Sequence, residues 1–136
     1  MLVVAANPET RLLLGVATRS LERQLGEPLE FVEAADGEAG VRVAWRERPD
    51  VVVADEIISR AGAFSLAHDL RGATEPYRGV IVIVLDRPHD AWLARWSGAD
   101  AWFVRPVDAF EMADTVLELV RASRGMDVLA ERAGAG

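Results

Sequence analysis

Two continuous apolar runs constrain the fold of this 136-residue chain more than any other feature. The first is VVVA at residues 51–54, and the second is GVIVIVL at residues 79–85. Strands that are apolar on both faces are typical of parallel sheets covered by helices on both sides. Further strands are expected at residues 1–5, 29–34 and 101–104. Because amphipathic segments separate these strands, the sequence predicts an α/β fold with five parallel strands alternating with five helices.

Local signals place the ends of several helices. Asn7, Pro8 and Glu9 form a good helix start, because Asn caps the helix and Pro suits its first position. This helix is expected to run to about residue 25 and to stop at Gly26. Asp36-Gly37 is expected to turn the chain before a second helix, which ends near residue 48. Further helices are expected around residues 65–70, 89–97 and 108–123.

The sequence indicates one domain over residues 1–123. Residues 124–136, which end in AERAGAG, are interpreted as a C-terminal tail, either a frayed helix or a linker stub. No effector domain is recognised after residue 123, so the chain is interpreted as a free-standing domain or a fragment of a longer regulator.

Composition excludes several classes of function. The chain has no cysteine, which excludes disulfides and cysteine-based metal sites or nucleophiles. Its net charge of −7 argues against direct binding to nucleic acid. No signal peptide and no apolar run long enough to span a bilayer is present, so a cytoplasmic protein without membrane contact is expected. His68 and His89 are isolated and expected at the surface, and no nucleotide-binding or hydrolase motif occurs.

Four segments together carry a resemblance to a known family. In order and approximate spacing, NPETRLLL, VEAADGEAGVR, RPDVVVAD and GADAWFVRPVDAFEM resemble the CheY-like receiver domain of response regulators in two-component signalling. The resemblance covers residues 1–123. It implies a flavodoxin-like, doubly wound parallel sheet with strand order 2-1-3-4-5 and a role in phosphorelay signal transduction.

Three features of the receiver pattern bear on its phosphorylation chemistry: the phosphoacceptor, the acidic pair and the Ser or Thr of the fourth strand. The resemblance implies that Asp55, at the end of the third strand, is the phosphoacceptor position. Receivers also carry an acidic pair after the first strand that helps to hold Mg²⁺, and here the pair is replaced by Ala5 and Ala6. The Ser or Thr that ends the fourth strand in receivers is replaced by Val84 or Leu85.

These replacements remove the groups that support phosphoryl transfer. Mg²⁺ prefers oxygen ligands from carboxylates and water, which two alanines do not supply, so neither Mg²⁺ nor any other cofactor is expected. Without the metal, a phosphoryl oxygen about 4 Å from a carboxylate is repelled by roughly 4 kcal/mol per charge pair. That barrier corresponds to a rate loss on the order of a thousandfold. The chain is therefore interpreted as a degenerate receiver, not an enzyme, that signals through protein–protein interaction.

Two other functions stay open. A regulator still phosphorylated on Asp55 is favoured by the aspartate and by Pro106, but opposed by the two alanines. A flavodoxin-like ligand-binding domain or enzyme has no motif in its support.

The resemblance places Arg105 where receivers carry a lysine before a cis-proline, here Pro106. One interpretation is a simple substitution in a chain whose basic residues are all arginine. The other, which we favour, is an ion pair with Asp55 that locks the site without phosphate. Alternatively, Asp55 is a vestigial acid without a role in phosphorylation, and its carboxylate is stabilised by helix N-termini or by Arg105.

Three further polar residues are expected near the carboxyl edge of the sheet. Asn7, Glu56 and Asp86 could offer oxygens to an atypical cation. The simpler interpretation, which we favour, makes Asn7 a helix cap and the two acids solvated rim charges.

The tryptophans are candidates for an interface. Trp92 and Trp96 are one helical turn apart, and Trp102, on the last strand, corresponds to the aromatic that swings on activation in receivers. The resemblance places them on the face of the fourth helix, fifth strand and fifth helix, where a sensor kinase, an effector domain or a second copy would bind. Trp96 or Leu93 is expected to point inward and Trp92 to be partly exposed. Trp45 is expected to pack against a core edge.

Overall fold

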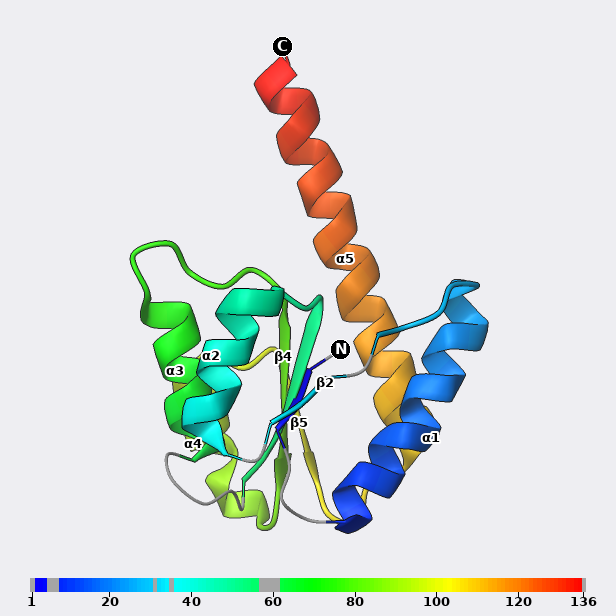
Figure 1. The fold of residues 1–136 in the computed structure, drawn as a ribbon, viewed down its shortest axis with the longest axis vertical. Helices are drawn as coiled ribbons and strands as arrows, with labels where there is room; N and C mark the ends of the chain where they lie inside the picture. The colour runs from blue at the N-terminus through cyan, green and yellow to red at the C-terminus, as the bar shows by residue number, and fades with distance from the viewer. Residues whose placement is uncertain (1, 5–7, 31, 35, 57–61, 136) are drawn as a thin grey trace.

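A computed structural model of the chain describes residues 2–4, 8–30, 32–34, 36–56 and 62–135 (Figure 1). Five parallel strands form one sheet in the order β2-β1-β3-β4-β5. The strands are β1 (Leu2–Val4), β2 (Val32–Ala34), β3 (Val51–Asp55), β4 (Val80–Leu85) and β5 (Ala101–Val104). The helices are α1 (Pro8–Leu25), α2 (Gly37–Glu47), α3 (Ala63–Gly72), the short 3-10 helix η1 (Pro88–Asp90), α4 (Ala91–Ser97) and α5 (Ala109–Ala135). The predicted fold class and strand order are confirmed.

The helices cover both faces of the sheet, with α1 and α5 on one side and α2, α3 and α4 on the other (Figure 1). Strand β4 shows why its sequence is continuously apolar. Ile81, Ile83 and Leu85 belong to the core beneath α2–α4, whereas Val82 and Val84 belong to the core beneath α1 and α5. Both alternating sets are buried, as a central parallel strand requires.

Local signals set the ends of α1 and α2. Helix α1 ends before Gly26, whose φ of 71° is the left-handed conformation expected of a terminating glycine. Asp36 does more than turn the chain, because its carboxylate accepts a hydrogen bond of 2.9 Å from the Ala39 N–H and caps α2. Strand β2 is shorter than expected, and α3 extends beyond the predicted limits at both ends.

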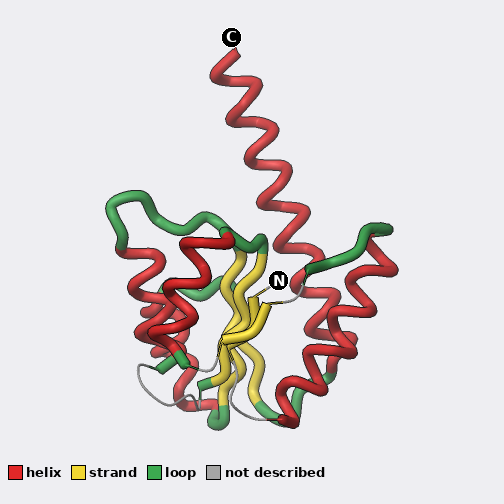
Figure 2. The backbone as a smooth tube through the Cα atoms, in the orientation of Figure 1, coloured by secondary structure: helices red, strands yellow, loops and turns green. Residues whose placement is uncertain are grey.

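Helix α5 is longer than predicted. The expected end at residue 123 is wrong, because the helix continues to Ala135. No proline follows Ser123, and most of the next residues are good helix formers, so nothing in the local sequence stops the helix. The added turns project away from the sheet (Figure 2). Within the described residues, no helix is both long and apolar enough to cross a membrane.

Candidate functional site at the carboxyl edge of the sheet

Asp55 lies at the centre of the carboxyl edge, where parallel α/β folds gather their functional groups. It is the last residue of β3 and pairs in register with Val84 of β4. The residue is completely buried. Its Oδ2 accepts a 2.7 Å hydrogen bond from Thr10 Oγ1 and forms an ion pair with Nη2 of Arg105. The carboxylate is therefore held between the first turn of α1 and the segment that follows β5.

Arg105 joins Asp55 to the loop after β4. Its Nε donates to Oδ1 of Asp86 over 3.0 Å, so one guanidinium contacts two carboxylates. Burial lowers the pKa of Arg105, but the hydrogen bond and charge of Asp55, followed by those of Asp86, outweigh burial, and the pKa is raised overall. The ion pair predicted between Arg105 and Asp55 is present, and the Arg105–Pro106 peptide bond is cis as the resemblance implies.

Glu56 and Asp86 are more than solvated rim charges, and that prediction is wrong. The backbone N–H of Asp86 donates a 2.6 Å hydrogen bond to Oε2 of Glu56, and Asp86 is paired with Arg105. Register explains the contact, because the Glu56 N–H bonds to the carbonyl oxygen of Val84 and brings the ends of β3 and β4 together. Burial, and then a hydrogen bond with Asp90, raises the pKa of Glu56 to about 7, although the Asp86 N–H opposes the rise.

This raised pKa predicts a pH dependence of stability. The folded chain holds the Glu56 proton up to about pH 7, whereas the unfolded chain releases it near pH 4.5. Between these values the folded state binds more protons, so Glu56 makes the free energy of unfolding fall as pH rises. Chemical denaturation from pH 4.5 to 7.5 should show a shallower fall in Glu56→Gln than in the native chain. Identical slopes in the two proteins would contradict the assignment.

The end of β4 offers no polar side chain to the site. Val84 and Leu85 are both completely buried, in the cores on opposite faces of the sheet. Neither carries a hydrogen-bond donor that could contact a phosphoryl oxygen. Ala5, Ala6 and Asn7, the other predicted pocket residues, lie outside the described residues.

The described residues do not fit the Mg²⁺ ion that the receiver resemblance implies. A hard divalent cation needs several oxygen ligands. At this edge Asp55 holds the position from which receivers bind Mg²⁺ through a carboxylate. Here the guanidinium of Arg105 already neutralises that carboxylate. Asp86 is engaged by the same guanidinium.

Thr10 is a site residue that the sequence reasoning missed. Its side chain is completely buried although it lies in the first turn of a helix. One signal was available, because the helix that follows the first strand begins at the same edge where the third strand ends. A polar residue in its first turn can therefore reach the end of that strand.

On α4, Trp92 is exposed as predicted, but the inward position expected of Trp96 or Leu93 is wrong. Trp92 is 66% exposed and Trp96 58% exposed, and Leu93 is only half-buried, so neither Trp96 nor Leu93 points into the core. Helix α4 has only seven residues, and Ala94 and Ser97 form its buried face. This leaves both tryptophans on the outside.

Contacts orient the two sides of α4. Trp96 stacks on His68 of α3, with ring centroids 4.3 Å apart and planes 7° apart. On the β5 side, the guanidinium carbon of Arg95 lies 5.8 Å from the ring centroid of half-buried Trp102. Trp45 packs against the core as predicted, edge-on to Tyr77.

The geometry defines a class of protein. A doubly wound sheet of order 2-1-3-4-5 carries a buried aspartate at the end of β3 and a basic residue before a cis-proline after β5. These are the features of a receiver domain.

Comparison with known proteins agrees with this class. An uncharacterized response regulatory protein of Mycobacterium tuberculosis is 34% identical over 94 residues, which are 69% of this chain and 70% of that protein. Response regulator PleD of Caulobacter vibrioides is 27% identical over 121 residues, which span 87% of this chain but only 27% of PleD. No protein-family model matches the chain. The chain belongs to the response-regulator family and is a receiver domain.

Solved structures show the same fold. The receiver domain of a sensor histidine kinase from Pseudomonas aeruginosa, with magnesium coordinated in its active-site cleft, superposes with a TM-score of 0.70. It is 21% identical, and the match covers 88% of this chain and 94% of that one. The BeF3-activated receiver domain of RstA from Klebsiella pneumoniae gives a TM-score of 0.70 at 22% identity, covering 88% and 97% of the two chains.

Proposed function

We propose that this chain is an atypical receiver whose signalling does not depend on Mg²⁺-assisted phosphorylation of Asp55. It acts as a protein-interaction module in the cytoplasm, without a cofactor and without enzymatic activity. The functional unit is residues 1–123, and the rest of α5 is a C-terminal tail or linker stub. One observation carries this proposal. The carboxylate of Asp55 is completely buried and already engaged, by a hydrogen bond from Thr10 and an ion pair with Arg105.

The chemistry of phosphoryl transfer supports the proposal. The accepting oxygen must approach phosphorus in line, and nearby cations must neutralise the two anions that meet. Here Oδ2 already accepts from Thr10 and pairs with Arg105, so attack through that oxygen requires both contacts to break. Val84 and Leu85 then provide no hydroxyl to hold the product.

Intact mass spectrometry tests the proposal. The native chain is incubated with Mg²⁺ and acetyl phosphate, beside Asp55→Asn and a receiver domain known to accept phosphate. We expect the competent receiver to gain one phosphoryl group and the native chain to gain none. A phosphoryl adduct on the native chain that is absent from Asp55→Asn would overturn the proposal. It would instead establish a phosphorelay regulator with a modified pocket.

The exposed aromatic surface of α4 supports a docking role. Trp92 and Trp96 present two large side chains on a short helix, and tryptophans are enriched among residues that dominate binding energy. Beside them, Arg95 and Trp102 continue the surface onto β5. We infer that this surface receives a sensor kinase, an effector domain or a second copy of the chain.

Sedimentation velocity separates self-association from binding to another protein. If a second copy docks here, the native chain should show a concentration-dependent dimer that Trp92→Ser weakens at least tenfold. Leu12→Ser is the matched control, since Leu12 is 76% exposed on α1, which covers the other face of the sheet. Equal weakening by both substitutions would contradict docking through α4. A native chain that stays monomeric would exclude the second copy as the partner.

A further inference from the structure

A second candidate surface lies on the face of the sheet that α4 does not cover, where α1 and α5 run side by side (Figure 1). A groove of about 350 Å³ opens there along α1. Its lining comes from α1 and from the first turn of α5, and consists of Val16, Arg19, Glu22, Arg23 and Phe110. None of these residues belongs to the Asp55 site or to the aromatic surface of α4, so occupation of the groove is independent of the function proposed above.

The apolar part of the groove is open to solvent. Phe110 is 57% exposed, and half-buried Val16 lines the same groove from α1. Leu12, which is 76% exposed, lies one helical turn before Val16 and extends the apolar strip. An exposed apolar strip with polar residues around it is typical of a surface that contacts another molecule.

Two arginines give the groove its charge. Arg19 and Arg23 are one turn apart on α1, and both are exposed. Nε of Arg19 donates a 3.3 Å hydrogen bond to the carbonyl oxygen of Gly15. Among the described residues, no carboxylate forms an ion pair with either guanidinium. Both positive charges are therefore available to an acidic partner.

Two acids close to these arginines are already engaged. Oε1 of Glu22 accepts a 3.1 Å hydrogen bond from the backbone N–H of Leu29. Oδ1 of Asp114, on α5, accepts a 3.2 Å hydrogen bond from Nε2 of Gln24. The groove thus presents two unpaired cations on a chain whose net charge is −7. An acidic partner is repelled by most of the surface and attracted here, so charge favours both this partner and this orientation.

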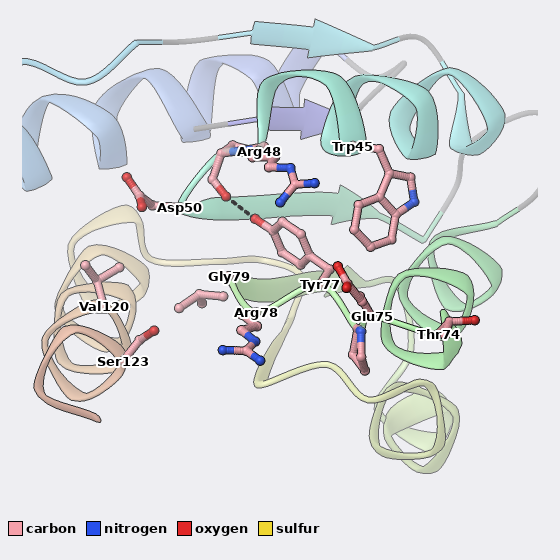
Figure 3. A pocket seen from close by; sticks show the side chains of 13 residues that line it. Trp45, Arg48, Asp50, Thr74, Glu75, Tyr77, Arg78, Gly79, Val120 and Ser123 are labelled. Carbon is pink, nitrogen blue, oxygen red and sulfur yellow. Dashed lines mark hydrogen bonds between the residues drawn. The ribbon is translucent and has the colours of Figure 1, made fainter. Parts of the chain in front are cut away.

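A larger cavity, of about 600 Å³ at the amino edge of the sheet, lacks this arrangement (Figure 3). Arg48 and Arg78 lie on opposite sides of the Tyr77 ring, and Tyr77 is only 5% exposed. The carboxylate of Glu75 lies at the Trp45 end. The two cations of this cavity therefore do not share one wall, and no apolar surface between them is free.

We propose that the groove on α1 binds a short acidic segment of another protein that carries one large apolar side chain. The apolar side chain lies between Val16 and Phe110, as anchor residues do in the pockets of protein interfaces. Carboxylates on either side of it pair with Arg19 and Arg23. The volume of the groove is near the lower end of the range for ligand sites, roughly 300–1,000 Å³, so it suits a single anchor.

Nuclear magnetic resonance titration of the full chain tests this proposal with three short peptides. The peptide GEEFEEG carries both the acids and the apolar anchor, GKKFKKG reverses the charge, and GEEAEEG removes the anchor. At millimolar concentration we expect GEEFEEG to shift the backbone amides of Val16, Arg19 and Phe110. The other two peptides should each bind at least tenfold more weakly, because one is repelled by the arginines and the other leaves the apolar strip uncovered.

Matched variants localise the effect. Arg19→Glu and Arg23→Glu should each weaken the binding of GEEFEEG at least tenfold and strengthen that of GKKFKKG. Arg78→Glu, at an exposed arginine of the cavity in Figure 3, should change neither. Phe110→Ser should also weaken GEEFEEG, whereas Phe110→Leu should keep most of the affinity because it keeps an apolar side chain. Melting curves that coincide with the native curve show that the variants are folded.

Several results would overturn the proposal. They are the absence of shifts with GEEFEEG, equal binding of GEEFEEG and GKKFKKG, shifts confined to other surfaces, and an equal loss in Arg78→Glu. Shifts of the same amides when the chain is concentrated without peptide would assign the groove to a second copy instead. None of these results bears on the phosphorylation of Asp55, which the intact-mass experiment decides separately.

Discussion

Arg105→Ala is expected to lower the free energy of unfolding by about 3 kcal/mol, because removing one partner of a buried ion pair strands the other charge. Asp55 is completely buried. Of its two partners described above, Thr10 and Arg105, the substitution leaves only Thr10. Asp86 would lose its cation at the same time. For a domain of this size, such a loss corresponds to a fall of roughly 10 °C in melting temperature.

A double-mutant cycle with Asp55→Asn separates the ion pair from other effects of the substitution. Once the carboxylate is neutral, removal of Arg105 should cost much less than it does in the native chain. Arg87→Ala, at an exposed arginine of the same edge, is the control and should be nearly neutral. A melting curve of Arg105→Ala that coincides with the native curve would show that the ion pair between Arg105 and Asp55 does not stabilise the site.

The sequence was a good guide to the fold because burial on two faces leaves a strong signal. The continuous apolar run that became β4 is the clearest case, since a central parallel strand buries both of its alternating sets of side chains and all six residues are buried here. Helix ends were predicted where a residue acts through its own backbone, as Gly26 does. The end of α5 was missed because a helix lacking a stop signal continues until something outside the local sequence ends it.

The site was predicted only in part, and the reason is again physical. Asp55 and Arg105 were found because the receiver resemblance assigns a role to the residue at the end of the third strand and to the residue before the proline after the fifth. The contacts of Thr10 and Glu56 depend on how α1 and η1 lie over that edge, which no local pattern encodes. The same limit applies to Trp96, whose exposure follows from the short length of α4 and from the stacking with His68.

The second large effect is expected from restoring acids at positions 5 and 6. The chain carrying Ala5→Asp and Ala6→Asp should gain stability in millimolar Mg²⁺, whereas the native chain should not. The receiver resemblance implies that the two added carboxylates share a metal site with Asp55, so that they repel it and one another without a cation, and a divalent ion relieves that repulsion. An ion present at a hundred times its dissociation constant stabilises the folded state by about 2.7 kcal/mol. Thermal melting at constant ionic strength measures the difference.

Arg105 decides how large this gain can be. The guanidinium already serves as the cation for Asp55, so Mg²⁺ must compete with it for the same carboxylate. Adding Arg105→Lys to the double variant should increase the response to Mg²⁺, because a lysine cannot make the same two-sided contact with Asp55 and Asp86. Adding Asp55→Asn should abolish the response. The stability of the double variant could also be insensitive to Mg²⁺, both with the native Arg105 and with Arg105→Lys. In that case positions 5 and 6 do not correspond to the acidic pair of receivers, and the loss of metal binding needs another explanation.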